Sequence, residues 1–376
     1  MPNNKPILFH QKIGIIGGGQ LGRMMAIAAK YMGYRVIVLD PTPDCPTAQV
    51  ADEHIVAAYD DLEAIKELAE KADVVTYEFE NVDLQAAQLL EEQGLLPQGS
   101  NSLRVTQDRE LEKETMDNVN QPVAPYAIVK TSQELTEQAH EIGFPCVAKT
   151  CRGGYDGKGQ VKLNSKADLA EAEEMLDKTG RLIIEKWVPF DKEISVVFTR
   201  SMNGEIEFFP ISENIHRDHI LHASIAPGRV AEGITKKARQ AAKAIAEELQ
   251  VVGTFAIEMF VKDEDILINE LAPRPHNSGH YTIEACDVSQ FEQHIRAICQ
   301  LPLLPVHAHQ GAVMVNLLGK DIEPFFTRIQ EFSTGHIHMY GKKDNKPLRK
   351  MGHVTFIGNS ASSIYENLKE QSLIQD

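Results

Sequence analysis

The sequence predicts an α/β region followed by an α+β region, and two patterns along the chain lead to this. In the first third, apolar strands expected at 12–16, 35–39 and 74–77 alternate with helical patterns. Beyond residue 108, short strands follow one another with turn signals between them. Alternating strands and helices form right-handed βαβ units with a parallel sheet, whereas runs of short strands favour antiparallel pairing.

The second region is expected to hold short strands, a long helix and a hairpin. An apolar stripe at helical spacing predicts a helix over 235–249. A hairpin is expected from strands 254–261 and 266–271, closed by the acidic turn 262–265. The other strands of this region are expected at 146–149, 160–163, 182–185, 194–199, 207–210, 312–317, 336–340 and 353–356.

Length, charge and cysteine content narrow the class of protein. The 376 residues and the changes of pattern suggest a doubly wound domain over 1–105, a central domain over 106–300 and a small C-terminal domain over 301–376. The formal net charge of −16 argues against nucleic acid as a partner. Five cysteines without C-x-x-C spacing argue against disulfides. Since no signal-peptide core and no apolar stretch of ~20 residues is visible, we expect a cytoplasmic protein without a membrane partner.

The first glycine motif follows the first expected strand. Gly17, Gly19 and Gly22 have the spacing G-x-G-x-x-G, and Asp40 ends the next strand. In dinucleotide-binding folds such glycines let the main chain approach a phosphate at a helix N-terminus, and the acid binds a ribose. An NAD-dependent dehydrogenase is therefore one hypothesis. The alternative is a tight strand–helix turn that needs small residues and binds no dinucleotide.

A second glycine-rich segment, 153–159, lies between two expected strands and holds four glycines in seven residues. It lacks the spacing of a P-loop, but a glycine-rich hairpin loop can cover phosphates and offer main-chain N–H groups. Lys149 before the loop and Lys158 within it favour phosphate binding over a plain flexible hairpin. Further on, the strand end 185–188 (EKWV) can present main-chain groups to an adenine edge and a carboxylate to ribose hydroxyls.

Two acidic residues, Glu258 and Glu270, are expected to face each other across the hairpin. With the turn centred on residue 264, they lie opposite each other in an antiparallel pair, with Cβ atoms roughly 5 Å apart. Such carboxylates repel each other unless a proton or a cation lies between them, and Mg²⁺ with open positions for phosphates meets this need. A salt-bridged or protonated pair is the alternative. Asn269 points to the other face of a regular strand, so a role at the metal requires a bulge.

The segment 272–280 (APRPHNSGH) follows directly and is stiffened by two prolines. Its polar side chains Arg274, His276 and Asn277 indicate a site that handles an oxyanion, while its histidines lack the further ligands of a zinc site. Near the C-terminus, 340–343 and 349–350 concentrate positive charge on an acidic protein. This charge suits either an anion site or a solvated basic loop.

Taken together, these motifs resemble the ATP-grasp superfamily and, within it, the N5-carboxyaminoimidazole ribonucleotide synthases of purine biosynthesis. The resemblance covers about residues 13–354 and is carried by GIIGGGQLGRM, TYEFENV, GGYDGKGQ, NELAPRPHNSGHYTIEA, MVNLLGK and RKMGHV. It implies an N-terminal doubly wound domain, a central ATP-grasp pair that closes on the nucleotide and a small C-terminal domain. It also implies that ATP and bicarbonate form carboxyphosphate, which carboxylates 5-aminoimidazole ribonucleotide and leaves ADP and phosphate. A homodimer with Mg²⁺, or Mn²⁺ in its place, and without biotin is implied as well.

The resemblance assigns roles to individual residues. The implied ATP contacts are Arg109, Lys149, Gly154, Tyr155, Asp156, Gly157, Lys158, Gly159, Gln160, Glu185, Lys186, Trp187, Val188, Glu193, His216, Asn269 and Glu270. The implied contacts to the aminoimidazole ribonucleotide are Gly18, Gln20, Leu21, Glu78, Tyr155, Asp156, Lys342 and Arg349. The implied metal ligands are Glu258 and Glu270, and Ala272 stands where many ATP-grasp ligases place an asparagine. The expected catalytic residues are Lys149, Asp156, Arg274, His276 and Asn277.

Three other functions remain as alternatives from the sequence. A ligase of the same fold could activate formate or an amino-acid carboxylate, but the whole set of motifs argues against this. The NAD-dependent dehydrogenase leaves Glu258 and Glu270 unexplained. A nucleotide-sensing module without activity is disfavoured because the polar residues that turnover requires are all present.

Overall fold

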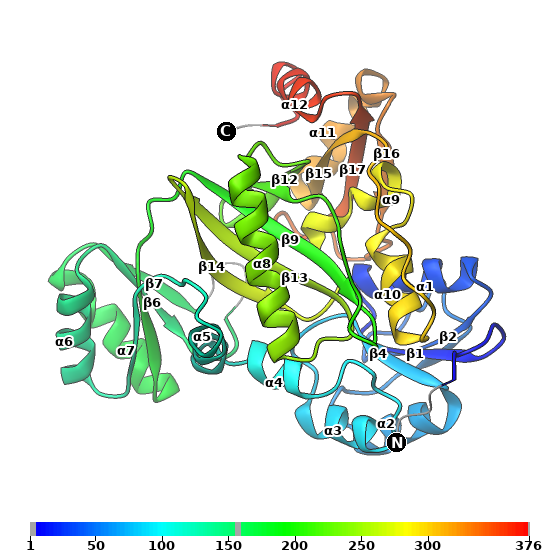
Figure 1. The fold of residues 1–376 in the computed structure, drawn as a ribbon, viewed down its shortest axis with the longest axis horizontal. Helices are drawn as coiled ribbons and strands as arrows, with labels where there is room; N and C mark the ends of the chain where they lie inside the picture. Colours follow the sequence, from blue (N-terminus) through cyan, green and yellow to red (C-terminus); the bar gives the residue numbers. More distant parts are fainter. Residues whose placement is uncertain (1–4, 155–158, 375–376) are drawn as a thin grey trace.

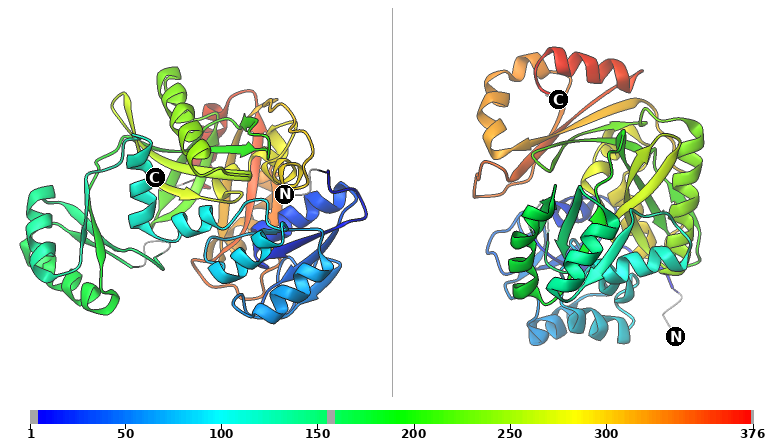
Figure 2. Two further views of the ribbon diagram at one scale, coloured as in Figure 1. Left: turned by 60° about the horizontal axis from the view of Figure 1, so that its bottom comes forward. Right: turned by 90° about the vertical axis from the view of Figure 1, so that its left-hand side faces the viewer.

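The computed structural model describes residues 5–154 and 159–374. The described chain forms three sheets, which Figure 1 shows as an N-terminal sheet at the lower right, a small sheet at the left and a large sheet across the middle and top. The left view of Figure 2 shows the small sheet and its helices as a lobe that projects from the rest of the molecule. No helix among the described residues is long and apolar enough to cross a membrane.

The N-terminal sheet is parallel, with strand order β3-β2-β1-β4. Its elements are β1 (Lys12–Ile16), α1 (Gln20–Tyr31), β2 (Arg35–Leu39), β3 (Glu53–Ile55), α2 (Leu62–Lys71), β4 (Val74–Tyr77) and α3 (Leu84–Glu92). Separate apolar clusters bury the two faces, with α1 on one and α2 and α3 on the other. The parallel sheet and strands β1, β2 and β4 confirm the prediction. The edge strand β3 was not predicted, because only its last residue is buried and no apolar run marks it.

The small sheet is antiparallel, with strand order β5-β8-β6-β7. Its elements are β5 (Tyr126–Val129), α6 (Ser132–Ile142), β6 (Cys146–Thr150), β7 (Gln160–Leu163), α7 (Leu169–Thr179) and β8 (Leu182–Lys186). Successive side chains of a strand point to opposite faces. In β6, Cys146 and Ala148 therefore pack against α6 and α7, and Val147 and Lys149 point to the other face, where the cavity described below lies.

The large sheet has strand order β14-β13-β9-β11-β12-β15-β17-β16, with β10 paired to β9, and its strands pair in antiparallel fashion. Its strands are β9 (Lys192–Arg200), β10 (Ile206–Phe208), β11 (Ser212–Arg217), β12 (Ile220–Ala226), β13 (Gly253–Lys262), β14 (Asp265–Ala272), β15 (Gly311–Leu318), β16 (His336–Met339) and β17 (Lys350–Gly358). The predicted long helix is α8 (Glu232–Glu248), whose alanine and isoleucine stripe packs on this sheet. The last three strands continue the sheet instead of forming one of their own.

Shorter helices lie between or after these strands. They are α4 (Asn101–Thr106), α5 (Arg109–Asn118), α9 (Thr282–Ala285), α10 (Gln290–Ile298), α11 (Ile322–Thr327) and α12 (Ala361–Glu370). The helix α10 lies against both α1 and β13, as Figure 1 shows, and its side chains Phe291, Ile295 and Ile298 share a core with the N-terminal sheet. It therefore fixes the N-terminal part of the chain to the large sheet.

A buried histidine in α10 joins the same two parts by hydrogen bonds. The Nδ1 of His294 accepts from the Thr254 N–H at 3.0 Å, and its Nε2 lies 2.8 Å from Thr76 Oγ1. Complete burial lowers the pKa of His294 to about 3. An unfolded chain gives histidine a pKa of about 6.5. The unfolded chain therefore takes up a proton between these two values and the folded protein does not, so stability is full above this window and is lost as the pH falls through it.

This difference predicts acid sensitivity that depends on His294. Lowering the pH from about 7.5 to about 5 should reduce the free energy of unfolding by about 2 kcal/mol through this residue alone. Urea denaturation at the two pH values measures the change, and in His294→Gln the pH-dependent loss should be smaller by that amount. The exposed His140 gives the matched control, because His140→Gln should retain the full loss. Equal losses in the two variants would contradict the prediction.

Candidate active site

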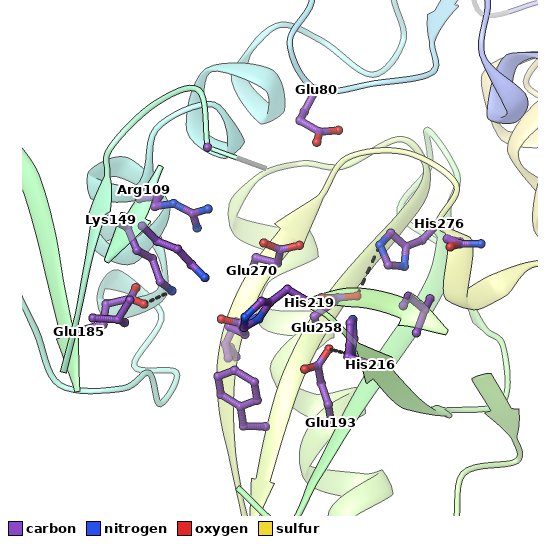
Figure 3. A pocket seen from close by; sticks show the side chains of 18 of the residues that line it. Glu80, Arg109, Lys149, Glu185, Glu193, His216, His219, Glu258, Glu270 and His276 are labelled. Carbon is purple, nitrogen blue, oxygen red and sulfur yellow. Dashed lines mark hydrogen bonds and ion pairs between the residues drawn. The ribbon is translucent and has the colours of Figure 1, made fainter. Parts of the chain in front are cut away.

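A cavity of about 680 Å³ lies where the three sheets of the described chain meet. Figure 3 shows its two walls: Arg109, Lys149 and Glu185 on the side of the small sheet, and Glu193, Glu258 and Glu270 on the large sheet. Gln20, the first residue of α1, and Glu78, the residue after β4, also line the cavity.

Most residues assigned from the sequence line this one cavity. They are Gln20, Leu21, Glu78, Arg109, Lys149, Gly154, Gln160, Glu185, Lys186, Trp187, Val188, Glu193, His216, Glu258, Asn269, Glu270, Arg274, His276 and Asn277. Gly18, Gly159, Lys342 and Arg349 are described but are not part of the lining. Tyr155, Asp156, Gly157 and Lys158 lie outside the described residues.

The two acidic residues on the hairpin lie opposite each other as predicted, but a β-bulge and not the position of the turn brings them into register. Glu258 and Glu270 are paired across β13 and β14, as expected. The turn, however, is closed by Lys262 opposite Asp265, so its centre lies between residues 263 and 264 and not at residue 264. A regular ladder from this turn would put Glu258 opposite Asn269. A β-bulge inserts Asn269 as an extra residue and moves Glu270 into register, and this is how Asn269 also comes to line the cavity.

A carboxylate and a histidine that were not predicted as metal ligands lie beside Glu258, in a cluster that does not include Glu270. Ligand atoms of Glu193, His216 and Glu258 all lie within 4.8 Å of one another, and His216 Nδ1 is 3.3 Å from Glu193 Oε1. Burial, followed by the charge of Glu270, raises the pKa of Glu193 to about 8. Burial, followed by the charges of Glu193 and Glu270, raises the pKa of Glu258 well above its ordinary value. These carboxylates therefore require a cation or protons, and their hard oxygen donors suit Mg²⁺.

The opposite wall carries buried cations. Lys149 and Lys113 both form ion pairs with Glu185, the latter at 3.1 Å. Burial alone would raise the pKa of Glu185, but the two lysines outweigh it and hold the pKa at about 2. The Glu185 carboxylate, expected to meet ribose hydroxyls, thus already serves to orient Lys149. Because Lys149 and Arg109 line the cavity opposite the acids, a polyphosphate fits between the two walls.

The segment after β14 is held by amide side chains. The buried Gln290 accepts from the His276 N–H at 2.9 Å and donates to the His276 carbonyl at 2.7 Å. Asn277 and Asn316 exchange two amide hydrogen bonds of 3.0 and 2.7 Å. Burial, with the nearby charges of Arg274 and Lys350, lowers the pKa of His276 far below its ordinary value. A neutral His276 therefore faces the cavity on a backbone that is fixed on both sides.

The first glycine motif does not offer a free phosphate site. The Gly18 N–H donates to Asp40 Oδ2 at 2.7 Å, the Gly22 N–H donates to Glu78 Oε2 at 2.7 Å, and the Gly19 N–H donates to the same Glu78 carboxylate. In a dinucleotide fold these amides face the pyrophosphate and the acid after the second strand faces the ribose. Here the N–H groups donate to carboxylates of the protein itself, so the dehydrogenase hypothesis is wrong. The same hydrogen bonds hold Glu78, which lines the cavity.

The basic C-terminal segment meets the cavity through a residue that was not predicted. Lys342 donates to the Lys350 carbonyl at 2.8 Å, and Arg349 Nη1 donates to the Asp344 carbonyl at 3.3 Å. It is Lys350 that lines the cavity. Its position next to Arg349 in RKMGHV was visible in the sequence, but which of two adjacent cations faces inward depends on the strand register of β17.

Further lining residues were missed because their sequence context is that of ordinary core. Phe190 and Phe260 stack with ring centroids 4.5 Å apart, and Val147 and Ile268 lie in the same lining. Among the described residues, the N–H groups of Lys186 and Trp187 donate to Pro125 and Pro145 carbonyls, whereas that of Val188 has no protein acceptor. This apolar slot with one available donor suits an adenine ring. The other unpredicted lining residues are Phe79, Glu80, Lys113, Ala124, His219 and Leu221.

The cavity lies between an antiparallel lobe that carries lysines and a sheet that carries acids, as expected for an ATP-grasp ligase. Three family models match the chain in agreement with this: the ribonucleotide synthetase preATP-grasp domain over 10–107, the ATP-grasp domain over 114–291 and the phosphoribosylaminoimidazole carboxylase C-terminal domain over 312–367. The chain belongs to the N5-carboxyaminoimidazole ribonucleotide synthase family, as its relatives show.

Two curated relatives with this name are similar over nearly their full length. The Bacillus subtilis enzyme is 51% identical over 92% of this chain and 91% of its own. The Staphylococcus aureus (strain COL) enzyme is 43% identical over 97% and 98%. A solved synthetase in complex with ADP is 52% identical and covers 98% of each chain with a TM-score of 0.95. The Aspergillus clavatus enzyme, solved with ADP and 5-aminoimidazole ribonucleotide, is 32% identical and covers 97% of each chain with a TM-score of 0.88.

Proposed function

We propose that this chain carboxylates 5-aminoimidazole ribonucleotide with bicarbonate, using ATP, to give N5-carboxyaminoimidazole ribonucleotide, ADP and phosphate. The observation that supports it most is the pair of facing walls, with Lys149 and Arg109 on one and three carboxylates on the other, in one cavity. The members of the family to which the chain belongs are named for the product of this reaction. The same cavity extends from the adenine slot to Glu78 and Lys350, so that nucleotide and substrate share one space.

The first step forms a better electrophile from bicarbonate. An oxygen of bicarbonate attacks the γ-phosphorus of ATP, the bond to the ADP oxygen breaks, and carboxyphosphate and ADP result. Phosphoryl transfer depends on positioning and on neutralisation of charge more than on a protein nucleophile. Lys149 and Arg109 supply this positive charge from the small-sheet side, and Glu185 keeps Lys149 in place.

We further propose that Glu258 and Glu270 hold Mg²⁺, with Glu193 and His216 beside them. Their oxygen donors and the raised pKa values of Glu258 and Glu193 fit a divalent cation in this position. When bound, the ion would neutralise phosphate charge. Mn²⁺ offers the same ligand preference as an alternative.

The second step transfers the carboxyl group. The amine nitrogen of the aminoimidazole attacks the carboxyl carbon, phosphate leaves, and the nitrogen loses a proton. We assign the hydrogen bonds to the transferred group to His276 and Arg274, because both line the cavity, His276 is neutral and the buried Arg274 is held by Glu80 at 2.6 Å. We also propose a cytoplasmic homodimer, which light scattering on the purified protein tests for its stoichiometry.

The test of the reaction is ADP release by the purified protein with Mg-ATP and ¹³C-bicarbonate. We expect release to depend on 5-aminoimidazole ribonucleotide, the label to appear in the product by NMR, and a chelator to abolish both. If release instead responds to formate, an amino acid or another amine, the substrate assignment fails while the ATP-grasp assignment stands. If release continues unchanged in excess chelator, the metal assignment fails.

A further inference from the structure

Two buried charged residues of α5, Glu112 and Lys113, lie against the strand that carries Glu270. Both side chains are almost fully buried, at 3% and 2% exposure. Neither was assigned a role from the sequence. A charged group is buried only where specific partners compensate the loss of water, so the partners of these two residues indicate what they do.

Their partners are main-chain groups on either side of Glu270. Lys113 Nζ donates to the Asn269 carbonyl at 3.3 Å, and Glu112 Oε1 accepts from the Leu271 N–H at 2.7 Å. The strand β14 is the edge of the large sheet, so its outward groups have no neighbouring strand. One residue earlier, the Ile268 N–H donates to the Pro122 carbonyl. The side chains of α5 thus provide hydrogen-bond partners for the outer edge of β14. They do so at the position where the bulge interrupts the regular pairing of β14 with β13.

Lys113 also reaches the opposite wall of the cavity. The same Nζ lies 3.1 Å from Glu185 Oε1, and the other oxygen of Glu185 pairs with Lys149. The ammonium group of Lys113 therefore has two contacts. One is with Glu185, the carboxylate that orients Lys149, and the other is with the carbonyl of the bulged residue Asn269. Lys113 therefore links the wall that carries Lys149 to the strand that carries Glu270.

We propose that Glu112 and Lys113 are positioning residues, which hold the bulged segment 269–271 so that Glu270 faces the cation and phosphates. The proposal rests on the proposed metal role of Glu270. Outer-shell partners of this kind typically contribute 10–100-fold to metal affinity or activity. Neither residue needs to touch substrate for this effect, because a bulge without fixed partners can shift its register and turn the carboxylate away.

The test compares Glu112→Leu with Glu112→Gln, whose amide oxygen can still accept from the Leu271 N–H. Binding of Mn²⁺ to the ADP complex is measured by electron paramagnetic resonance, and binding of ADP without metal by calorimetry. We expect Glu112→Leu to weaken Mn²⁺ binding about tenfold or more, with metal-free ADP affinity unchanged, and Glu112→Gln to bind Mn²⁺ as the wild type does. Glu114→Leu, at an exposed position of the same helix, should also behave as the wild type.

The outcomes separate this proposal from the proposed function. A wild-type ADP complex that binds no Mn²⁺ would refute the metal role itself. Normal Mn²⁺ binding in Glu112→Leu, or an equal loss in Glu112→Leu and Glu112→Gln, would overturn the positioning role while the metal role stands. If Glu112→Leu does not fold, Mn²⁺ binding is measured in Lys113→Met instead, and normal binding in that variant would overturn the proposal equally.

Discussion

Replacing Glu270 with alanine is expected to lower the rate of carboxylation by about 10²–10³-fold, with the fold retained. The carboxylate lies in the cavity lining and is only partly buried, so its removal leaves no cavity in the apolar core. Under the proposed assignment, the variant loses a charged cation ligand next to the transferred phosphoryl group, where charge develops during the reaction. ADP release at saturating substrates measures the rate, and circular dichroism with thermal unfolding verifies the fold.

The same hairpin provides a matched control for this variant. Glu264 lies exposed at the turn between β13 and β14, far along the strands from the bulge. Glu264→Ala removes the same negative charge from the protein and should leave the rate within about twofold, since exposed surface charges contribute little. A Glu270→Ala enzyme with near wild-type turnover would remove the argument that the acidic wall binds the cation and the phosphates.

Replacing Lys149 with methionine should reduce kcat/KM for ATP by about 10²–10³-fold. Methionine preserves most of the side-chain volume and removes the ammonium group that faces the acids across the cavity. Glu185 keeps its second partner, Lys113, at 3.1 Å, so the variant does not leave that buried carboxylate unpaired. Under the proposed role of Lys149, its charge acts on the phosphates throughout the reaction, so we expect kcat to fall as well as ATP affinity.

Steady-state kinetics with ATP as the varied substrate separate the two effects. The exposed Lys130, near the end of β5, serves as a control, and Lys130→Met should have unchanged kinetics. If Lys149→Met raises KM for ATP with kcat unchanged, the lysine binds ground state and transition state equally well. If both parameters stay at wild-type values, Lys149 has no part in phosphate binding.

The elements that could be predicted from sequence are those with a strong local signal. The parallel sheet up to residue 77 follows from apolar runs that alternate with helical stripes, and α8 from alanines and isoleucines at helical spacing. Strands β11 and β12 were missed, although β12 is buried along its whole length. They contain histidine, serine and asparagine at buried positions, where side-chain partners on neighbouring strands replace the apolar signal.

The residues of the candidate site divide in a similar way. Lys149, Glu258, Glu270 and His276 stand in segments whose composition alone indicated phosphate, metal and oxyanion chemistry, and the structure brings them to one cavity. The sequence did not predict that Glu193 lies beside Glu258. The two residues are 65 positions apart and meet only because β9 pairs with β13.

The sequence by itself determined the class of fold, the hairpin that carries Glu258 and Glu270 and the chemistry that these ligands suit, because these depend on residue type and on spacing within one segment. Only the tertiary structure decided how the segments meet. The carboxylates that occupy the first glycine loop and the two charges of α5 behind Glu270 arise from contacts between residues far apart in the chain, and the bulge at Asn269 is a register shift within the hairpin that no local pattern marks. Such contacts depend on sheet register and helix docking, which are set by packing of the whole molecule and leave no signal at any single position.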